Sequence, residues 1–207
     1  MSTIRRIYVE KKEGYNVEAK QLLTDFKETL QLEDLEDLRI VNRYDIEGLS
    51  QEAYQQACYT ILAEPPVDNL YKEELKLADD ELAFGIEYLP GQYDQRADSA
   101  EQCMQILNND EKPTVRTARI IVLQGDLTKE DLEKIKDYYI NPVDSREAEL
   151  AKPATLEMEY KVPTEVPSID GFIEADEEGI EELLTEVGLA MSKEDLLHTQ
   201  KYFRDVE

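Results

Sequence analysis

A repeat with a period of 77 residues constrains this chain more than any other feature. Four markers recur at that offset: Glu10 and Gly14 recur as Glu87 and Gly91, Gly48 as Gly125, and Pro65 as Pro142. Glycine and proline are used where the backbone needs a special conformation, so their recurrence is structural. Self-similarity at a fixed period predicts two copies of one folding unit, over residues 1–76 and 77–151.

The first copy alternates strand-like and helix-like patterns. In order, it predicts a strand around Ile7 and Val9, a helix carrying Leu22 to Leu30, a hairpin of residues 38–41 and 44–46 around Asn42-Arg43, a helix from Ser50 to Pro65-Pro66, and a weak strand over 67–73.

The second copy predicts the same order. It has a strand over 83–89, a helix capped by Asp94, a β run over 114–123, and a helix opened by the capping box Thr128-Lys-Glu-Asp131. The helix after Asp94 places Ala97, Ala100, Cys103, Met104 and Leu107 on one face. Each unit therefore reads as β-α-β-β-α-β, or a trimmed version of it, which is the split βαβ arrangement.

We therefore expect an α+β protein of two tandem ferredoxin-like units related by pseudo-two-fold symmetry, whose two half-apolar sheets bury each other. Residues 152–175 contain several prolines, which disfavour a long helix, and the range is therefore predicted to be an extended connector. Residues 176–207 then predict a small helical domain with helices over 176–187 and 192–203, too poor in large apolar residues to enclose a core alone.

The charge balance excludes several partners. The chain has 23 Lys+Arg against 48 Asp+Glu, a formal net charge of −25. Such a surface repels phosphate backbones and anionic lipid, so no nucleic acid and no membrane is expected as a partner. No apolar leader or span occurs in the sequence, and a cytoplasmic protein is expected. Cys58 and Cys103 lack metal-ligand or redox spacing and are expected to be buried free thiols.

No catalytic, cofactor or metal constellation is visible in the sequence. His198 is the one histidine, no glycine-rich phosphate loop occurs, and Asp79-Asp80 and 176–178 lack the spacing of a calcium loop. The turn-to-helix junction with Gln92, Asp94, Gln95 and Arg96 stands apart, because Arg96 lies in a first helical turn, which favours anions. Arg96 is expected to have a fixed partner, either an acid of this chain or an external carboxylate or phosphate.

Several motifs give the chain a family resemblance over nearly its whole length. They are Tyr88-Leu-Pro-Gly-Gln-Tyr-Asp-Gln-Arg-Ala-Asp-Ser-Ala-Glu-Gln-Cys103, Arg6-Ile-Tyr-Val-Glu-Lys-Lys12, Arg39-Ile-Val-Asn-Arg-Tyr-Asp45, Asn141-Pro-Val-Asp-Ser-Arg-Glu147, Pro163-Thr-Glu-Val-Pro167 and Gly188-Leu-Ala-Met-Ser192. The set resembles the beginning of the large single-chain phosphoribosylformylglycinamidine synthase of purine biosynthesis. In that family the region resembles two fused PurS-type subunits followed by a linker domain.

The resemblance implies an ATP- and glutamine-dependent amidoligase that converts formylglycinamide ribonucleotide to the amidine, with ATP and Mg²⁺ used by the parent protein. The family's catalytic histidine motif, nucleotide site and glutaminase triad have no counterpart in residues 1–207, so this chain alone is expected to be inactive and to hold no cofactor.

We therefore expect a non-catalytic scaffold that braces the downstream synthetase and glutaminase domains for ammonia transfer, with Gln92, Asp94, Gln95 and Arg96 as interdomain contacts. Self-association of the isolated region is possible. Two alternatives stay open: a free-standing regulatory module of two split βαβ units that binds a small metabolite, and an acidic protein-interaction module. A reading frame continuing past Glu207 would favour the synthase, and a stop codon the regulatory module.

Overall fold

The structure is a computed structural model that describes residues 4–107, 112–157, 164–165 and 168–206. The chain divides into two compact units, residues 1–158 and 159–207. The first unit contains, in order, β1 (Arg5–Lys11), α1 (Val17–Leu30), β2 (Leu35–Glu47), α2 (Gln51–Ala57), the short π-helix η1 (Cys58–Leu62), β3 (Asp68–Lys72), β4 (Glu81–Tyr88), α3 (Gln95–Leu107), β5 (Thr114–Gly125), α4 (Lys129–Tyr139) and β6 (Ser145–Ala148).

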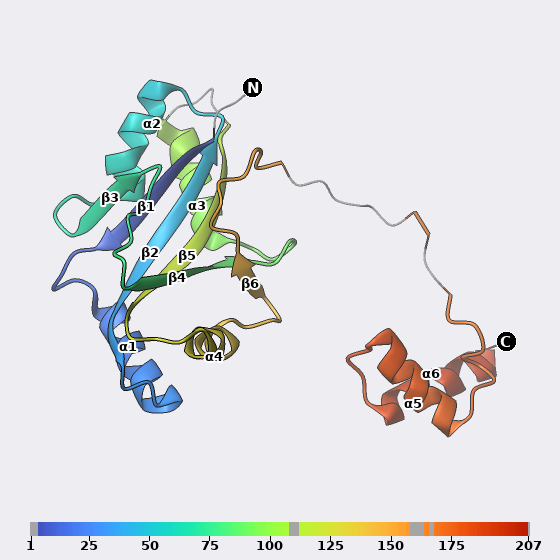
Figure 1. The fold of residues 1–207 in the computed structure, drawn as a ribbon. Helices are drawn as coiled ribbons and strands as arrows, with labels where there is room; N and C mark the ends of the chain where they lie inside the picture. Colours follow the sequence, from blue (N-terminus) through green and yellow to red (C-terminus); the bar gives the residue numbers. More distant parts are fainter. Residues whose placement is uncertain (1–3, 108–111, 158–163, 166–167, 207) are drawn as a thin grey trace. The chain divides into compact units, whose positions relative to one another are not determined.

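The six strands form one antiparallel sheet in the order β3-β1-β2-β5-β4-β6 (Figure 1). The first half of the unit supplies β3, β1 and β2, and the second half supplies β5, β4 and β6. The two halves meet where β2 pairs with β5, from Leu35 opposite Gly125 to Glu47 opposite Thr114. The protein is thus of the α+β class, and its elements are compatible with the split βαβ arrangement.

The helices cover one face of this sheet as two pairs, α2 with α3 and α1 with α4. Side chains alternate between faces along a strand, so Leu38, Tyr44 and Ile46 of β2 share a face. Tyr44 and Ile46 pack in a cluster with buried residues of α2 and α3, and Leu38 packs in another with buried residues of α1 and α4. Two separate apolar clusters therefore lie on the helix-covered face, one at each end of the central strands.

The opposite face combines a third apolar cluster, which includes Val41 and Ile120, with buried charges. Arg6 and Asp45 are each 2% exposed and form a bidentate pair, with Nε to Oδ1 at 2.6 Å and Nη2 to Oδ2 at 2.8 Å. Arg43 joins them, with Nε 3.3 Å from Asp45 Oδ2. Burial lowers the pKa of Arg43, and the like charge of Arg6 adds to this, so the net shift is downward although Asp45 opposes it.

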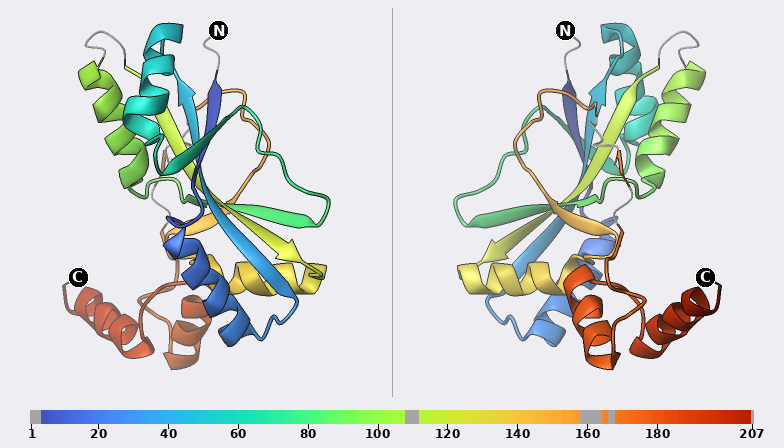
Figure 2. Two further views of the ribbon diagram at one scale, coloured as in Figure 1. Left: turned by 90° about the vertical axis from the view of Figure 1, so that its left-hand side faces the viewer. Right: turned by 90° about the vertical axis from the view of Figure 1, so that its right-hand side faces the viewer.

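The same arginines hold the chain that follows β6 against this face. Arg6 Nη1 donates to the Leu150 carbonyl at 2.6 Å, and Arg43 Nη1 donates to the Glu149 carbonyl at 2.7 Å. Farther along, Arg116 donates to the carbonyl of Leu156, whose side chain is 2% exposed. We call residues 149–157 the strap. In the left view of Figure 2 the orange chain leaving β6 lies on the other side of the strands from α2 and α3.

The structure corrects the prediction of a hairpin around Asn42-Arg43. Residues 35–47 form one continuous strand. Arg43, the charged residue of the expected turn, is accommodated within the sheet because it pairs with Asp45 on the face opposite the helices. The expectation of two sheets that bury each other is also wrong, since both halves share one six-stranded sheet.

Helix starts agree with their sequence signals. Ser50 caps α2, and Thr128 with Asp131 forms the capping box of α4. Both cysteines are free thiols, and the predicted burial is confirmed for Cys58 but wrong for Cys103, which is exposed. The face of α3 that packs on the sheet is formed by Ala97, Ala100 and Met104, and Cys103 lies outside it.

The second unit contains α5 (Glu177–Val187) and α6 (Lys193–Val206). Asp176 caps α5 through the Gly179 amide at 3.0 Å, and Ser192 with Asp195 forms a capping box at the start of α6. Gln200, 3% exposed, donates to the carbonyls of Phe172 and Ala175 and so links α6 to the turn that precedes α5. Of the predicted connector over 152–175, residues 158–163 and 166–167 lie outside the described residues.

Two glycines allow a matched stability test. Gly91 and Gly125 both have positive φ, +92° and +144°. A Cβ at Gly91 would meet nothing within 4 Å, whereas one at Gly125 would lie 2.1 Å from the Asp34 carbonyl oxygen. We expect Gly91→Ala to lower the free energy of unfolding by about 1 kcal/mol, and Gly125→Ala by on the order of 3 kcal/mol, in urea denaturation. Equal losses would contradict the close approach of Asp34.

Limited proteolysis tests the strap. We expect the first cleavage by a glutamate-specific protease to fall at Glu157 or beyond, and Glu149 to be protected because its carbonyl accepts from Arg43. Leu156→Ala should bring Glu149 into the early cleavage products, whereas Leu150→Ala, at a side chain 48% exposed, should leave the pattern unchanged. Early cleavage at Glu149 in the unmodified chain, mapped by mass spectrometry, would contradict a bound strap.

Candidate functional site

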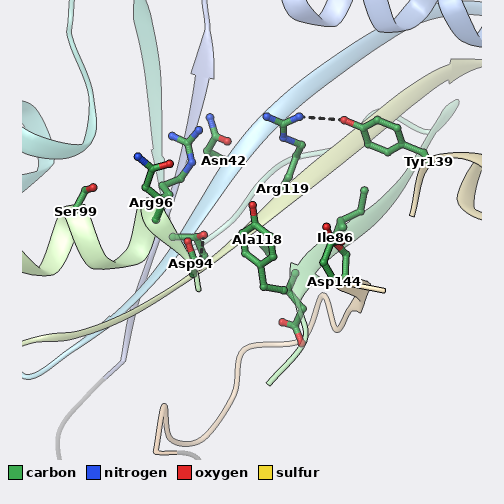
Figure 3. A pocket seen from close by; sticks show the side chains of 14 residues that line it. Asn42, Ile86, Asp94, Arg96, Ser99, Ala118, Arg119, Tyr139 and Asp144 are labelled. Atoms are coloured by element: carbon green, nitrogen blue, oxygen red, sulfur yellow. Dashed lines mark hydrogen bonds between the residues drawn. The ribbon is translucent and has the colours of Figure 1, made fainter. Parts of the chain in front are cut away.

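A cavity of about 550 Å³ opens on the helix-covered face of the sheet. It lies beside the N-terminus of α3, with further walls from β2, β4, β5, the end of α4 and the start of β6. Its floor lies between the two apolar clusters of this face, where the central strands carry polar side chains. Figure 3 shows the residues that line it.

The floor of the cavity is a cross-strand polar pair, Asn42 on β2 and Arg119 on β5, which lie directly opposite each other in the register. Among the described residues the Asn42 side chain makes no hydrogen bond. Arg119 Nη1 donates to the Tyr139 hydroxyl at 3.0 Å and pairs with Glu18 at 2.8 Å. Burial opposes the charge on Arg119, but the Tyr139 hydrogen bond and the Glu18 charge outweigh it, and the net effect raises its pKa.

Asp94 fixes the start of α3 against the sheet. Its Oδ1 accepts from the Ala97 amide at 2.9 Å, as the predicted N-cap should. Its Oδ2 accepts from the Thr117 hydroxyl of β5 at 2.7 Å. Both carboxylate oxygens are therefore engaged, and the helix N-terminus is held over the cavity.

Arg96 is the second residue of α3 and points toward the same cavity (Figure 3). Its Nη1 donates to the Tyr44 hydroxyl at 3.2 Å. The expected ion pair with an acid of this chain is not found: across the described ranges no carboxylate lies within ion-pair distance of Arg96. In a chain with 48 acidic residues, Arg96 thus forms no ion pair with any described residue, although Asp94 and Asp144 line the same cavity.

The other acidic groups at the cavity are already bound. Glu87 accepts from Arg146 Nε at 2.8 Å, and its carboxylate lies 3.9 Å from Arg43 on the face opposite the helices. Asp144 accepts from the Ser145 hydroxyl. Among the described lining residues, the guanidinium groups of Arg96 and Arg119 are thus the cationic groups of the cavity.

Three of the four residues singled out from sequence, Asp94, Gln95 and Arg96, line this cavity, while Gln92 does not. Their role as interdomain contacts stays a prediction. Sequence reasoning missed Asn42, Arg119 and Tyr139. Asn42 and Arg119 are 77 residues apart, so the repeat itself carried a signal that could have identified the pair.

Comparisons with known proteins add no assignment: no protein-family model matches the chain, and no curated protein matches it. In the part of the chain that the structure describes, no group of three or more His, Cys, Asp or Glu side chains could hold a metal ion. None of the described helices has the length and apolar character needed to cross a membrane.

Asp94 provides a test of how the cavity wall is built. Asp94→Ala removes the helix cap and the bond to Thr117, and we expect it to lower the free energy of unfolding by about 1–2 kcal/mol. Gln95→Ala is the control, because the exposed Gln95 side chain makes no hydrogen bond within the described residues. Equal stability of the two variants in urea denaturation would contradict the anchoring role of Asp94.

Proposed function

We propose that this chain is the N-terminal, non-catalytic scaffold and linker region of a phosphoribosylformylglycinamidine synthase, built from two tandem PurS-like units with pseudo-two-fold symmetry. Its task is to brace the downstream synthetase and glutaminase domains of the same cytoplasmic protein, so that ammonia passes between them without entering bulk water. Holding both sites in one body raises the effective concentration of the transferred molecule. ATP and Mg²⁺ belong to the parent protein.

The proposal rests mainly on one observation: residues 77 positions apart in the sequence occupy equivalent positions in the two halves of the sheet and its apolar clusters. Ile7, Tyr44 and Cys58 pack in the cluster beneath α2 and α3, and their counterparts Phe84, Ile121 and Ile135 pack in the cluster beneath α1 and α4. Gly14, Gly48 and their counterparts Gly91 and Gly125 all have positive φ. The strand order, β3-β1-β2 beside β5-β4-β6, is what a pseudo-two-fold axis between β2 and β5 would produce.

The residues of the family-like motifs support a structural role. Arg6, Arg43 and Asp45 form the buried ion network, and Arg39 binds Glu10 at 2.8 Å and Glu81 at 2.9 Å. Removing one partner of the buried Arg6–Asp45 pair would lower the free energy of unfolding by about 3–5 kcal/mol. These charged side chains link strands of the sheet and bind the strap to the sheet. Such a structural role suits a scaffold that fixes the chain segment following its last strand.

One observation favours the second candidate, a metabolite-binding regulatory module. The cavity lies where the two halves meet, with Asn42 from the first half and Arg96 and Arg119 from the second. Concave sites with a few convergent polar groups are where small molecules bind. The two candidates differ in what they need: a scaffold needs the downstream domains to have an effect, whereas a module responds to its ligand alone.

Complementation tests the scaffold. The purified chain alone should form no amidine from formylglycinamide ribonucleotide with ATP, Mg²⁺ and glutamine. Added to a separately expressed synthetase and glutaminase portion of a phosphoribosylformylglycinamidine synthase, it should restore glutamine-dependent turnover. A matched pair of variants sharpens the result: Leu156→Ala, which loosens the strap, should reduce the restored rate several-fold, while Leu150→Ala should not.

Two outcomes would contradict the scaffold role. Turnover by the chain alone, above a sample without it, would mean that it contains a reaction site. Absence of restored turnover, with both parts folded by circular dichroism, would mean that bracing by this chain is not required.

A further inference from the structure

We propose that the cavity beside the start of α3 is a binding site for a phosphate monoester dianion, held between the guanidinium groups of Arg96 and Arg119 with the Asn42 amide as a further donor. The inference concerns a ligand of this chain itself and does not depend on the assignment to the synthase.

Unused donors converge on this cavity from three elements. Arg96 uses Nη1 for Tyr44, and Arg119 uses Nη1 for both Tyr139 and Glu18. Within the described residues their Nε and Nη2 groups have no hydrogen-bond partner, and neither does the Asn42 amide. Figure 3 shows Arg96, Asn42 and Arg119 projecting into the same space. Guanidinium groups bind phosphate with paired N–H donors, and two of them match a dianion in charge.

The negative groups nearby do not fill the site. Both oxygens of Asp94 accept hydrogen bonds, from Ala97 and Thr117, and Glu87 is bound by Arg146. Asp144, which accepts from the Ser145 hydroxyl, also lines the cavity. Among the described residues, the acidic group that pairs with a guanidinium of the cavity is Glu18, which binds Arg119 and is 65% exposed. An exposed ion pair contributes little free energy, so a dianion that reaches two guanidinium groups can replace it.

The size of the cavity indicates a small metabolite rather than a bare ion. About 550 Å³ lies within the range of small-molecule sites, while a phosphate group alone occupies a minor part of it. Apolar surface from Ile86 and the ring of Tyr139 lines part of the remainder. The net charge of −25 weakens binding of any anion, so we expect inorganic phosphate to bind in the millimolar range.

Titration of the full chain with inorganic phosphate, followed by ¹H–¹⁵N NMR, tests the site. Saturable shifts should appear at the Nε–H groups of Arg96 and Arg119 and at the first-turn amides of α3. Arg96→Gln and Arg119→Gln should each weaken binding about tenfold, the factor for one charge-assisted hydrogen bond. The control Lys129→Gln removes a positive charge from an exposed side chain outside this cavity and should leave the affinity within about twofold.

Substitutions at Arg119 and Glu18 distinguish a loss of binding from a loss of folding. Arg119→Lys retains the charge if Arg119→Gln fails to fold, and should bind more weakly than the unmodified chain but more tightly than a folded Gln variant. Glu18→Gln should tighten binding because it removes the competing carboxylate, whereas Glu28→Gln, on an exposed position of the same helix, should change it less.

The proposal is overturned if phosphate shifts are not saturable or are the same in Arg96→Gln as in the unmodified chain. It is also overturned if acetate at equal ionic strength binds as tightly as phosphate, because the site would then take any carboxylate. Loss of phosphate binding would leave the complementation result of the scaffold unaffected, so the two proposals fail separately.

Discussion

The antiparallel pairing of β2 with β5 is the interaction on which the rest of this protein depends. These strands form the centre of the sheet and run together along nearly their whole length. Without the pairing, each half would expose a long strand edge with unpaired amide and carbonyl groups. The apolar clusters depend on it as well, because each contains residues of both halves: Val115 and Met104 pack with Ile7 and Tyr44 in one of them. The halves therefore cannot complete their cores separately.

The same pairing creates the cavity. The helices pack in two pairs at the two ends of the central strands, and the middle of that face carries Asn42 opposite Arg119 instead of two apolar side chains. A polar pair at the seam between two apolar clusters needs partners or solvent, since a buried polar group without a partner is costly. The arrangement keeps the seam open and lines it with α3, Tyr139 and the start of β6.

On the opposite face of the sheet, buried charged side chains are paired with side chains of opposite charge. Asp45 lies between Arg6 and Arg43, and the arginines use further N–H groups on the carbonyls of the strap. Charged side chains thus take the place of a second helical layer and bind a segment that has little secondary structure of its own. The direction in which the chain leaves the sheet is set by these hydrogen bonds.

The period of the repeat, the class of fold and the positions where helices begin could be predicted from the amino-acid sequence, because turns and caps are local. Positive φ at Gly91 and the Asp94 cap follow from a few neighbouring residues. The prediction for β2 failed, since local polarity at Asn42-Arg43 resembles a turn and only pairing with distant strands makes burial of Arg43 favourable. The cavity could not be predicted in this way, because Asn42, Arg96 and Arg119 lie on three elements and converge only once β2 and β5 pair.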